Sequence, residues 1–265
     1  MRGLILFDWD GTIVDEQNQI HDKQRFQQII QAKISQGWII GLNSDTPLRR
    51  LRRWRESLSM NGPIVAERGA VAWWPDEQHI VSEKADIFAA FRESLIQRLL
   101  QQEEYALFFG DNTEFIKSVN RIAVGDSVII ALDAYRKCSI GMFVRRVVNQ
   151  ELVCDISIAK NIQRLLESTS PSSFLVSAID FNERICFLCV NDPEVDKSRG
   201  VDVLLEKWGK PPHVYMIGDT MADYLNLPEV HQLAVGNAQP DYKEKAERIA
   251  VNNFAQGCIE LLSKI

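Results

Sequence analysis

The chain has 265 residues, a length that fits one or two domains. Hydrophobic residues make up 46% of it and charged residues 25%, with 14 Gly and 9 Pro, which excludes an intrinsically disordered or collagen-like chain. Thirty Lys and Arg stand against 36 Asp and Glu, and the net charge of −6 disfavours a protein that wraps a polyanion, whereas a small anionic ligand is compatible with it.

Strands and helices alternate near the start of the sequence. The continuous apolar run Leu4–Phe7 predicts a strand that is buried on both faces. Apolar residues at helical spacing predict a helix over Lys23–Gln36, and Trp38–Leu42 predicts a second buried strand. A helix that opens at Pro47 is expected next, followed by a third strand over Pro63–Ala66. This alternation is typical of a parallel sheet covered by helices on both faces.

The middle of the sequence, residues 74–190, has a different order of elements. We expect a long helix over Ser82–Gln102 and a second helix over Asp155–Ser168. The strands expected here are Tyr105–Phe109, Val128–Leu132, Ile140–Val148, Phe174–Ala178 and Ile185–Val190. Paired strands with interspersed helices predict an inserted α+β domain.

In the last part of the sequence, helices and strands alternate again, as they do near the start. The elements expected are a helix over Gly200–Trp208, a strand over His213–Ile217, a helix after Asp219, a strand over Gln232–Val235 and a last helix toward Ile265. The predicted fold is therefore α/β, with a doubly wound, mainly parallel sheet. Residues 1–73 and 191–265 form its core, and residues 74–190 form the insert.

Polar side chains follow several of the predicted core strands. Asp8 and Asp10 come after the first strand, Ser44 after the second, and Asp219 and Asp223 after the strand that ends at Ile217. In an open parallel sheet, ligands bind outside the carboxyl ends of the strands, so these groups are expected to converge. Clustered carboxylates repel one another unless a cation neutralises them. Mg²⁺ suits such a site because it prefers oxygen ligands.

These residues carry a resemblance to a known family. Asp8–Thr12 resembles D-x-D-G-T, the first motif of the haloacid dehalogenase superfamily of phosphohydrolases. Ser44 resembles the second motif, and Gly218–Asp223 resembles the fourth, G-D-x-x-x-D. For the third motif, a lysine, Lys197 is favoured and Arg199 is the alternative. The resemblance is specific because three motifs occur in the expected order along the chain, each directly after a predicted strand.

Further segments resemble the Cof-like and sucrose-phosphatase-like branch of this superfamily. Asn61–Ala70 resembles a segment of that branch that reads N-G-A, with Arg68 in place of the Asn. The stretch between Thr12 and Ser44 is too short for an inserted domain, whereas the stretch between Ser44 and Lys197 is long enough. The resemblance therefore implies a cap domain of the C2 position and type IIB.

The resemblance also implies catalytic roles. Asp8 would attack phosphorus and form an aspartyl-phosphate, and Asp10 would act as general acid and then general base. Ser44 and Lys197 would hold the phosphoryl oxygens.

The implied metal is Mg²⁺, in contact with Asp8, Asp10 through its backbone carbonyl, Asp219 and, as ligand or support, Asp223. Asn43 and Asn237 are weaker candidates for the substrate-binding shell, since a capping or turn role explains each equally well.

The implied substrate is a small phosphorylated metabolite, either a sugar phosphate or a phosphorylated acid. A phosphomutase on the same fold is an alternative. A non-enzymatic alternative is polyanion binding by the five arginines of Arg49–Arg55, although Leu48, Leu51, Trp54 and Leu58 recur at helical spacing, as on an ordinary amphipathic helix. We expect no nucleic-acid or membrane partner, and a monomer or small homo-oligomer.

Five cysteines, an odd number, imply no disulfide framework. Cys186 and Cys189 are expected as buried free thiols, because positions three apart in a strand point to opposite faces. The run Leu4–Phe7 is too short for a signal-peptide core, and no apolar stretch approaches a membrane span of about 20 residues. These features predict a cytoplasmic protein.

Overall fold

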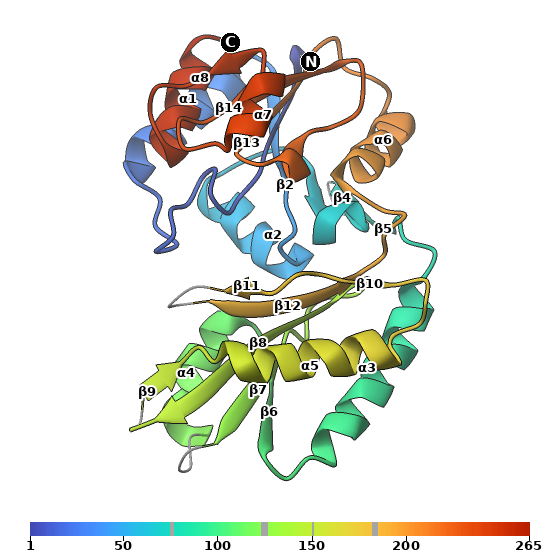
Figure 1. Cartoon of the computed structure of the whole chain (residues 1–265). Coiled ribbons are helices and arrows are strands. Elements are labelled where there is room, and N and C mark those ends of the chain that lie inside the picture. Colours follow the sequence, from blue (N-terminus) through green and yellow to red (C-terminus); the bar gives the residue numbers. More distant parts are fainter. Residues whose placement is uncertain (75–76, 123–126, 150, 182–184) are drawn as a thin grey trace. The chain divides into compact units, whose positions relative to one another are not determined.

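The computed structural model describes residues 1–74, 77–122, 127–149, 151–181 and 185–265 (Figure 1). The chain forms two compact units. Unit 1 comprises Met1–Val81 and Val195–Ile265, and unit 2 comprises Ser82–Glu194. Unit 2 thus begins and ends later than the insert expected at 74–190, because the segment before Val81 still pairs with the sheet of unit 1.

Unit 1 is built on an eight-stranded sheet. Its centre is β1 (Gly3–Phe7), which lies parallel to β2 (Trp38–Asn43) on one side and to β13 (Val214–Gly218) on the other. The outer strands are β3 (Ile64–Ala66), β4 (Val71–Trp74) and β5 (Glu77–Ile80) beyond β2, and β14 (Val230–Ala234) and β15 (Arg248–Ile249) beyond β13. Among the described strands of this sheet, the pairs β3–β4 and β4–β5 are antiparallel and the other pairs are parallel.

Helices cover both faces of this sheet. Phe7 of β1 packs edge-on against Phe26 of α1 (Lys23–Ser35), with 5.8 Å between ring centroids, and α1 lies beside α8 (Phe254–Ser263). On the other face, Leu4 and Leu6 share a buried cluster with residues of α6 (Lys197–Trp208). The opposite orientation of neighbouring strand side chains explains this division. The remaining helices of unit 1 are α2 (Leu48–Ser57), α7 (Pro240–Lys245) and the 3₁₀ turns η1 (Glu67–Gly69) and η2 (Met221–Asp223).

The helix expected after Asp219 is wrong. The chain there makes only the 3₁₀ turn η2 and is extended again at Tyr224. The side chain of Asp223 accepts hydrogen bonds from the backbone N–H groups of Asp219 and Thr220, so it closes a tight turn instead of starting a helix. Pro228 follows four residues later, and the residue before a proline is disfavoured in the helical region.

Unit 2 is an α+β unit with a second sheet of seven strands. Its strands are β6 (Tyr105–Phe109), β7 (Val128–Leu132), β8 (Ile140–Val148), β9 (Glu151–Val153), β10 (Leu175–Val176), β11 (Asp180–Phe181) and β12 (Cys186–Asn191). Its helices are α3 (Ala85–Leu100), α4 (Asn112–Ile122) and α5 (Ile156–Thr169). In the described part of this sheet, β6 and β7 pair in parallel and the other pairs are antiparallel. Residues of α3 and α5 bury one face of the sheet.

Two details of unit 2 differ from or refine the expectations. The segment Phe109–Thr113, which follows an expected strand, ends in the first turn of α4, where the Asp111 carboxylate accepts from the Glu114 N–H. Cys186 and Cys189 are free and buried, and only Cys186 belongs to the cluster beneath α3 and α5. No helix in the described part of the chain is both long and apolar enough to cross a membrane.

Candidate functional site

Three carboxylates and one ammonium meet where the central strands of unit 1 end. Asp8 follows β1, Asp219 follows β13, and Asp223 lies in η2. An oxygen from each of these three residues lies within 4.8 Å of the others. Lys197, the first residue of α6, adds its ammonium to this acidic cluster.

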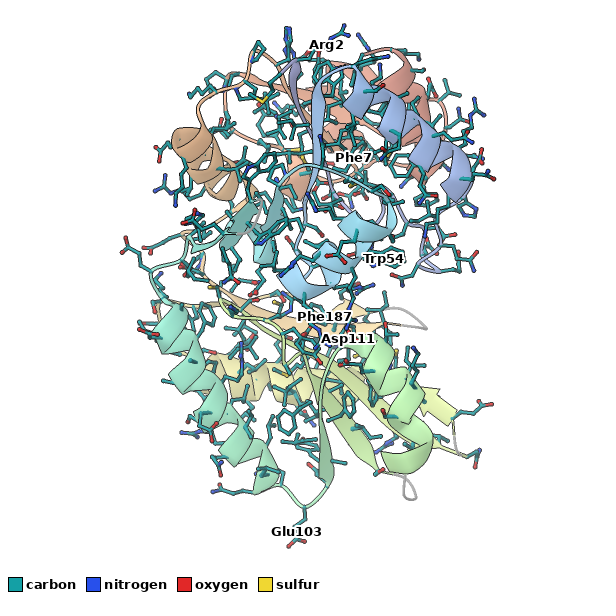
Figure 2. The ribbon with its side chains drawn as sticks, turned by 180° about the vertical axis from the view of Figure 1, so that it is seen from behind. Arg2, Phe7, Trp54, Glu103, Asp111 and Phe187 are labelled. Carbon is teal, nitrogen blue, oxygen red and sulfur yellow. The ribbon has the colours of Figure 1, made fainter. Side chains whose placement is uncertain are left out.

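Parallel pairing explains why residues so distant in sequence meet. Phe7 and Ile217 are register partners in β1 and β13, and the backbone N–H of Asp8 donates to the carbonyl of Ile217 at 2.9 Å. Both strands therefore reach their carboxyl ends together, and the next residues of each leave the sheet at the same edge. Phe7 itself is fully buried inside unit 1 (Figure 2).

Lys197 binds two of the carboxylates. Its Nζ donates to Asp8 Oδ1 at 2.7 Å and to Asp223 Oδ1 at 2.6 Å, and the Lys197 side chain is only 4% exposed. The start of α6 is fixed by Asp196, whose side chain accepts from the backbone N–H of Arg199. Arg199, the alternative to Lys197, is exposed and pairs with Asp202 at 3.1 Å on the surface.

The cluster carries more negative than positive charge. Burial, together with the neighbouring Asp223, raises the pKa of Asp8 well above its usual range, although Lys197 opposes this rise. The same two causes raise the pKa of Asp219 to about 7. Burial alone would lower the pKa of Lys197, but the carboxylates of Asp223 and Asp8 outweigh it and raise that pKa well above its usual value. Lys197 is therefore a permanent cation in a site that still lacks positive charge.

The donor set of the cluster fits a hard divalent cation. Both oxygens of Asp223 are already engaged, Oδ1 by Lys197 and Oδ2 by the N–H groups of Asp219 and Thr220. By contrast, Oδ2 of Asp8 and Oδ2 of Asp219 accept no hydrogen bond from any residue that the structure describes. These two oxygens are suited to Mg²⁺, which takes carboxylate ligands and adds positive charge where the site lacks it.

The loop after β1 is shaped around Asp219. Gly11 has a φ of 81°, and a side chain there would collide with the Asp219 carboxylate. Thr12, which is fully buried, donates its hydroxyl to Asp219 Oδ1 at 3.1 Å. The Asn237 amide donates to the carbonyl of Gly11 at 2.7 Å, and its oxygen accepts from the backbone N–H of Phe254. The structure thus places Asn237 as a brace behind the loop.

Asp10 is not one of the three clustered carboxylates. Its side chain is exposed, and its Oδ2 accepts from the Thr46 hydroxyl at 3.1 Å. Ser44 lies at the end of β2 and is 1% exposed, and its Oγ accepts from the Thr46 N–H at 3.3 Å. Thr46 therefore connects the loop after β1 with the loop after β2.

Asn43, the other candidate for substrate binding, is fully buried as the last residue of β2. Its amide nitrogen lies 4.0 Å from the sulfur of Met216, and its Oδ1 has no hydrogen-bond partner among the described residues. The structure therefore places Asn43 in the interior of unit 1, where its amide has one weak contact with a sulfur atom.

Sequence reasoning assigned no role to Thr12 and Thr46, although both contact a candidate catalytic carboxylate. Thr12 could have been identified from the sequence, because it is the last residue of the first motif. Thr46 was harder to identify, because only the short polar run after the second strand points to it. Trp9 was also missed: it stands between Asp8 and Asp10 in the sequence and is fully buried, and its ring centroid lies 4.6 Å from that of Trp54 in α2.

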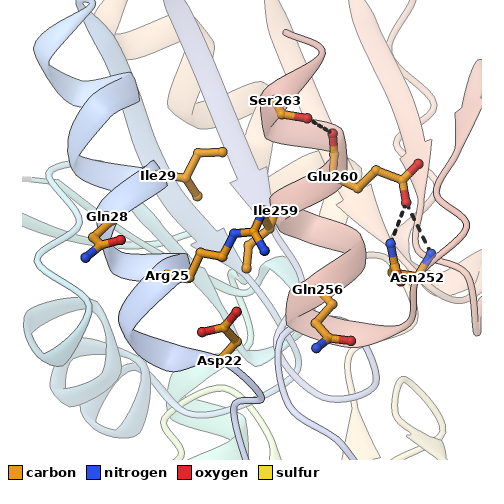
Figure 3. A pocket seen from close by; sticks show the side chains of 9 residues that line it. All are labelled: Asp22, Arg25, Gln28, Ile29, Asn252, Gln256, Ile259, Glu260 and Ser263. Carbon is orange, nitrogen blue, oxygen red and sulfur yellow. Dashed lines mark hydrogen bonds between the residues drawn. The ribbon is translucent and has the colours of Figure 1, made fainter.

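A second feature of unit 1 is a surface hollow of about 590 Å³ between α1 and α8 (Figure 3). Its lining is Asp22, Arg25, Gln28, Ile29, Asn252, Gln256, Ile259, Glu260 and Ser263. Glu260 is held inside by hydrogen bonds from Asn252. This lining includes none of the residues of the acidic cluster, so the hollow is separate from the candidate active site.

Comparison with known proteins connects this geometry to a family. The sequence model of one family, described as haloacid dehalogenase-like hydrolase, matches residues 5–262. No curated protein matches the chain. Similar solved structures include a haloacid dehalogenase-like hydrolase from Bacteroides thetaiotaomicron, with a TM-score of 0.68, 18% identity and coverage of 100% of this chain and 99% of that one.

Two other solved structures are similar over nearly the whole chain. A protein from Thermotoga maritima has a TM-score of 0.67 and 18% identity, and the match covers 100% of this chain and 98% of the Thermotoga maritima chain. The structure of the sucrose-phosphatase from Synechocystis sp. PCC6803 in complex with sucrose and phosphate has a TM-score of 0.57 and 12% identity. The match covers 99% of this chain and 97% of the sucrose-phosphatase chain. At these identities the likeness shows the fold alone.

Proposed function

Because the chain belongs to the haloacid dehalogenase-like hydrolase family, we propose that it is a Mg²⁺-dependent phosphomonoesterase that works through an aspartyl-phosphate on Asp8. The observation that carries this proposal is the position of the Asp8 carboxylate. It lies buried beside a permanent cation, with one oxygen bound to Lys197 and the other free of hydrogen bonds from the described residues. An oriented, desolvated carboxylate of this kind can act as a nucleophile.

In the first step, an Asp8 oxygen attacks phosphorus, and the bond between phosphorus and the ester oxygen breaks. Asp10 donates a proton to the departing oxygen, so an alcohol leaves. The exposed position of Asp10 suits this exchange with a leaving group, and the Thr46 hydroxyl holds its carboxylate at 3.1 Å. Lys197 and Ser44 stabilise the phosphoryl oxygens as charge shifts during transfer.

In the second step, Asp10 takes a proton from a water molecule, which attacks the phosphorus of the aspartyl-phosphate. The bond between phosphorus and the Asp8 oxygen breaks, and phosphate leaves while Asp8 returns as a carboxylate. Asp10 is thereby deprotonated in one step and protonated in the other, so each cycle restores it.

Asp8 and Asp219 would hold the metal, with the Asp10 backbone carbonyl as a further ligand and Asp223 as support. When bound, Mg²⁺ supplies positive charge that neutralises the oxygens of the transferring phosphoryl group. Thr12 and Asn237 maintain the geometry of this ligand set, because one binds the Asp219 carboxylate and the other holds the loop that packs against it.

We propose a small phosphorylated metabolite as substrate, a sugar phosphate or a phosphorylated acid, with unit 2 as the cap that selects it. A sucrose-phosphatase is among the proteins that share this fold. A nucleic-acid partner is not part of the proposal. The guanidinium carbons of Arg52 and Arg55 in α2 lie 5.1 and 5.0 Å from the ring centroid of Trp73, and Arg50 donates to the side chain of Asn18 at 2.9 Å. These three arginines therefore make their contacts within unit 1. Five free cysteines support a reducing, cytoplasmic location.

The test is phosphate release from a panel of phosphorylated metabolites with and without Mg²⁺. Asp8→Asn is expected to lower kcat by at least about 10³-fold, since a nucleophile cannot be replaced by an amide. Asp86→Asn, an exposed carboxylate in the first turn of α3, is the matched control and is expected to retain wild-type activity. Wild-type activity in Asp8→Asn would refute the proposal, and transfer of the phosphoryl group to a second sugar instead of water would identify a mutase.

A further inference from the structure

The backbone of η1 has an uncommon conformation beside the candidate active site. Glu67 and Arg68 both adopt positive φ angles, 49° and 59°, and Gly69 follows with 101°. Glycine adopts such angles freely and asparagine tolerates them, whereas a long side chain such as arginine is disfavoured there. Strained backbone of this kind persists where surrounding contacts fix it, and it concentrates at functional sites.

The contacts that fix this turn come from the segments carrying Ser44 and Lys197. The backbone N–H of Arg68 donates to the carbonyl of Ser44 at 3.3 Å, and that of Glu67 donates to the carbonyl of Thr46 at 3.2 Å. On the other side, Gly69 packs so closely on the backbone of Asp196 and Lys197 that a side chain would collide with it. Arg68 therefore stands between the two residues proposed to hold the phosphoryl group.

The Arg68 guanidinium makes no hydrogen bond, ion pair or ring contact with any residue that the structure describes. Other cations of this region are engaged: Lys197 binds Asp8 and Asp223, Arg50 binds Asn18, and Arg199 pairs with Asp202. Arg68 thus occupies a position that disfavours an arginine, and no side-chain hydrogen bond, ion pair or ring contact with the described residues compensates for it. A cation in this state is available to an anionic ligand.

We propose that Arg68 binds a second anionic group of the substrate, a carboxylate or a second phosphate, separate from the phosphoryl group that is transferred. This inference rests on the proposed function and narrows its substrate class to phosphorylated compounds with two anionic groups. A guanidinium presents a planar fork of donors that matches a carboxylate or phosphate in bidentate fashion.

Burial separates the two anion positions. Ser44 and Lys197 are 1% and 4% exposed, so the group they hold lies in the interior of the site. Arg68 is half-buried and so is closer to solvent than either of them. A second anion bound by Arg68 belongs to a part of the substrate that extends from the reacting phosphorus toward solvent.

The test compares two ligands that differ only in the second group, glycerol 3-phosphate and 3-phosphoglycerate. Calorimetric titration with Mg²⁺ is done in the Asp8→Asn background, so that neither ligand is turned over. We expect 3-phosphoglycerate to bind roughly 10- to 100-fold more tightly, and the addition of Arg68→Asn to remove most of that preference. Arg68→Lys, which keeps the charge but loses the fork, is expected to reduce it less.

Arg68→Asn is also a folding control, because asparagine suits the left-handed backbone. We expect its melting temperature to equal or exceed that of the parent. Equal affinity of the parent for the two ligands, no binding of either, or a preference that survives Arg68→Asn would overturn the inference. An equal loss for both ligands would overturn it too, since Arg68 would then contact the transferred phosphoryl group. Failure of the proposed function shows separately, as absence of phosphate release by the wild-type chain.

Discussion

Lys197 neutralises only part of the charge around it. It binds Asp8 and Asp223 in the interior of unit 1, while Asp219 remains beside them with a raised pKa. Removal of one partner from a buried ion pair leaves the other charge desolvated and uncompensated. The lysine is therefore expected to support both the fold and the chemistry.

We predict that Lys197→Met lowers the free energy of unfolding by about 3–5 kcal/mol at neutral pH. It should also reduce kcat/KM by about 10²–10³-fold, because a cation that stabilises the phosphoryl oxygens is lost. Arg199→Met is the matched control, since Arg199 is exposed and its pair with Asp202 contributes about 0–1 kcal/mol. Denaturant unfolding and phosphatase assays would measure both. Similar effects of the two substitutions would contradict the assignment of Lys197.

The raised pKa of Asp219 gives the metal-free protein a defined pH dependence. The folded pKa of about 7 lies above the ordinary value of 3.8, so between these values the folded state binds more protons than the unfolded state. Stability from this group is therefore present at low pH and falls as pH rises toward 7. Mg²⁺ bound at the proposed site would replace the proton and remove the penalty.

It follows that MgCl₂ should raise the melting temperature more at about pH 8 than at about pH 5.5. Thermal unfolding with and without MgCl₂ at both pH values checks this expectation. Asp219→Asn has no titrating group at this position. In this variant, the rise in melting temperature caused by MgCl₂ should differ less between the two pH values. A gain that is larger at the acidic pH in the wild-type chain would contradict the electrostatic account.

At the scale of elements, sequence patterns predicted the strands that carry the site better than the segments between them. The strands β1, β2 and β13 are continuous apolar runs, and their exit residues follow from parallel pairing. The 3₁₀ turn at Asp223 was missed because its carboxylate binds the backbone, which no periodicity reveals. The pair β4 and β5 was missed because β5 is a short, polar edge strand.

The Arg-rich helix α2 is better explained by packing than by polyanion binding. Leu48 and Leu51 are buried, and Trp54 packs against Trp9, the residue between Asp8 and Asp10. This contact connects the helix directly to the proposed nucleophile loop. The sequence showed the amphipathic pattern of α2, but the partner of Trp54 depends on a tertiary contact far from it in sequence.

Trp54→Ala is expected to destabilise the chain by about 1–3 kcal/mol, less than for a fully buried tryptophan because Trp54 is half-buried. It should also lower kcat several-fold, since Trp9 loses the surface that holds it between Asp8 and Asp10, the two carboxylates proposed to be catalytic. Glu56→Ala, exposed on the same helix, is the control and should change neither quantity measurably. Wild-type activity and stability of Trp54→Ala would contradict a positioning role for α2.

For the whole molecule, the α/β class, the inserted unit and the order of motifs followed from the sequence, because each motif stands directly after an apolar run. The boundaries of the insert did not, since β5 contains too few apolar residues to reveal that it extends the first sheet. The burial of Asn43, the brace formed by Asn237 and the free guanidinium of Arg68 among the described residues required three-dimensional contacts. Strands can be predicted from the pattern of apolar residues, whereas no pattern in the sequence shows which side chains surround a given residue.

The most direct test of the account is the mass of the intact Asp10→Asn protein after incubation with p-nitrophenyl phosphate and Mg²⁺. Without its acid and base, this variant should still react with an activated ester, whose leaving group needs no proton, but should hydrolyse the intermediate slowly. The account predicts the added mass of one phosphoryl group, located on Asp8 by peptide mapping and absent from the Asp8→Asn, Asp10→Asn double variant. A phosphoryl group on another residue, or its presence in the double variant, would contradict Asp8 as the nucleophile.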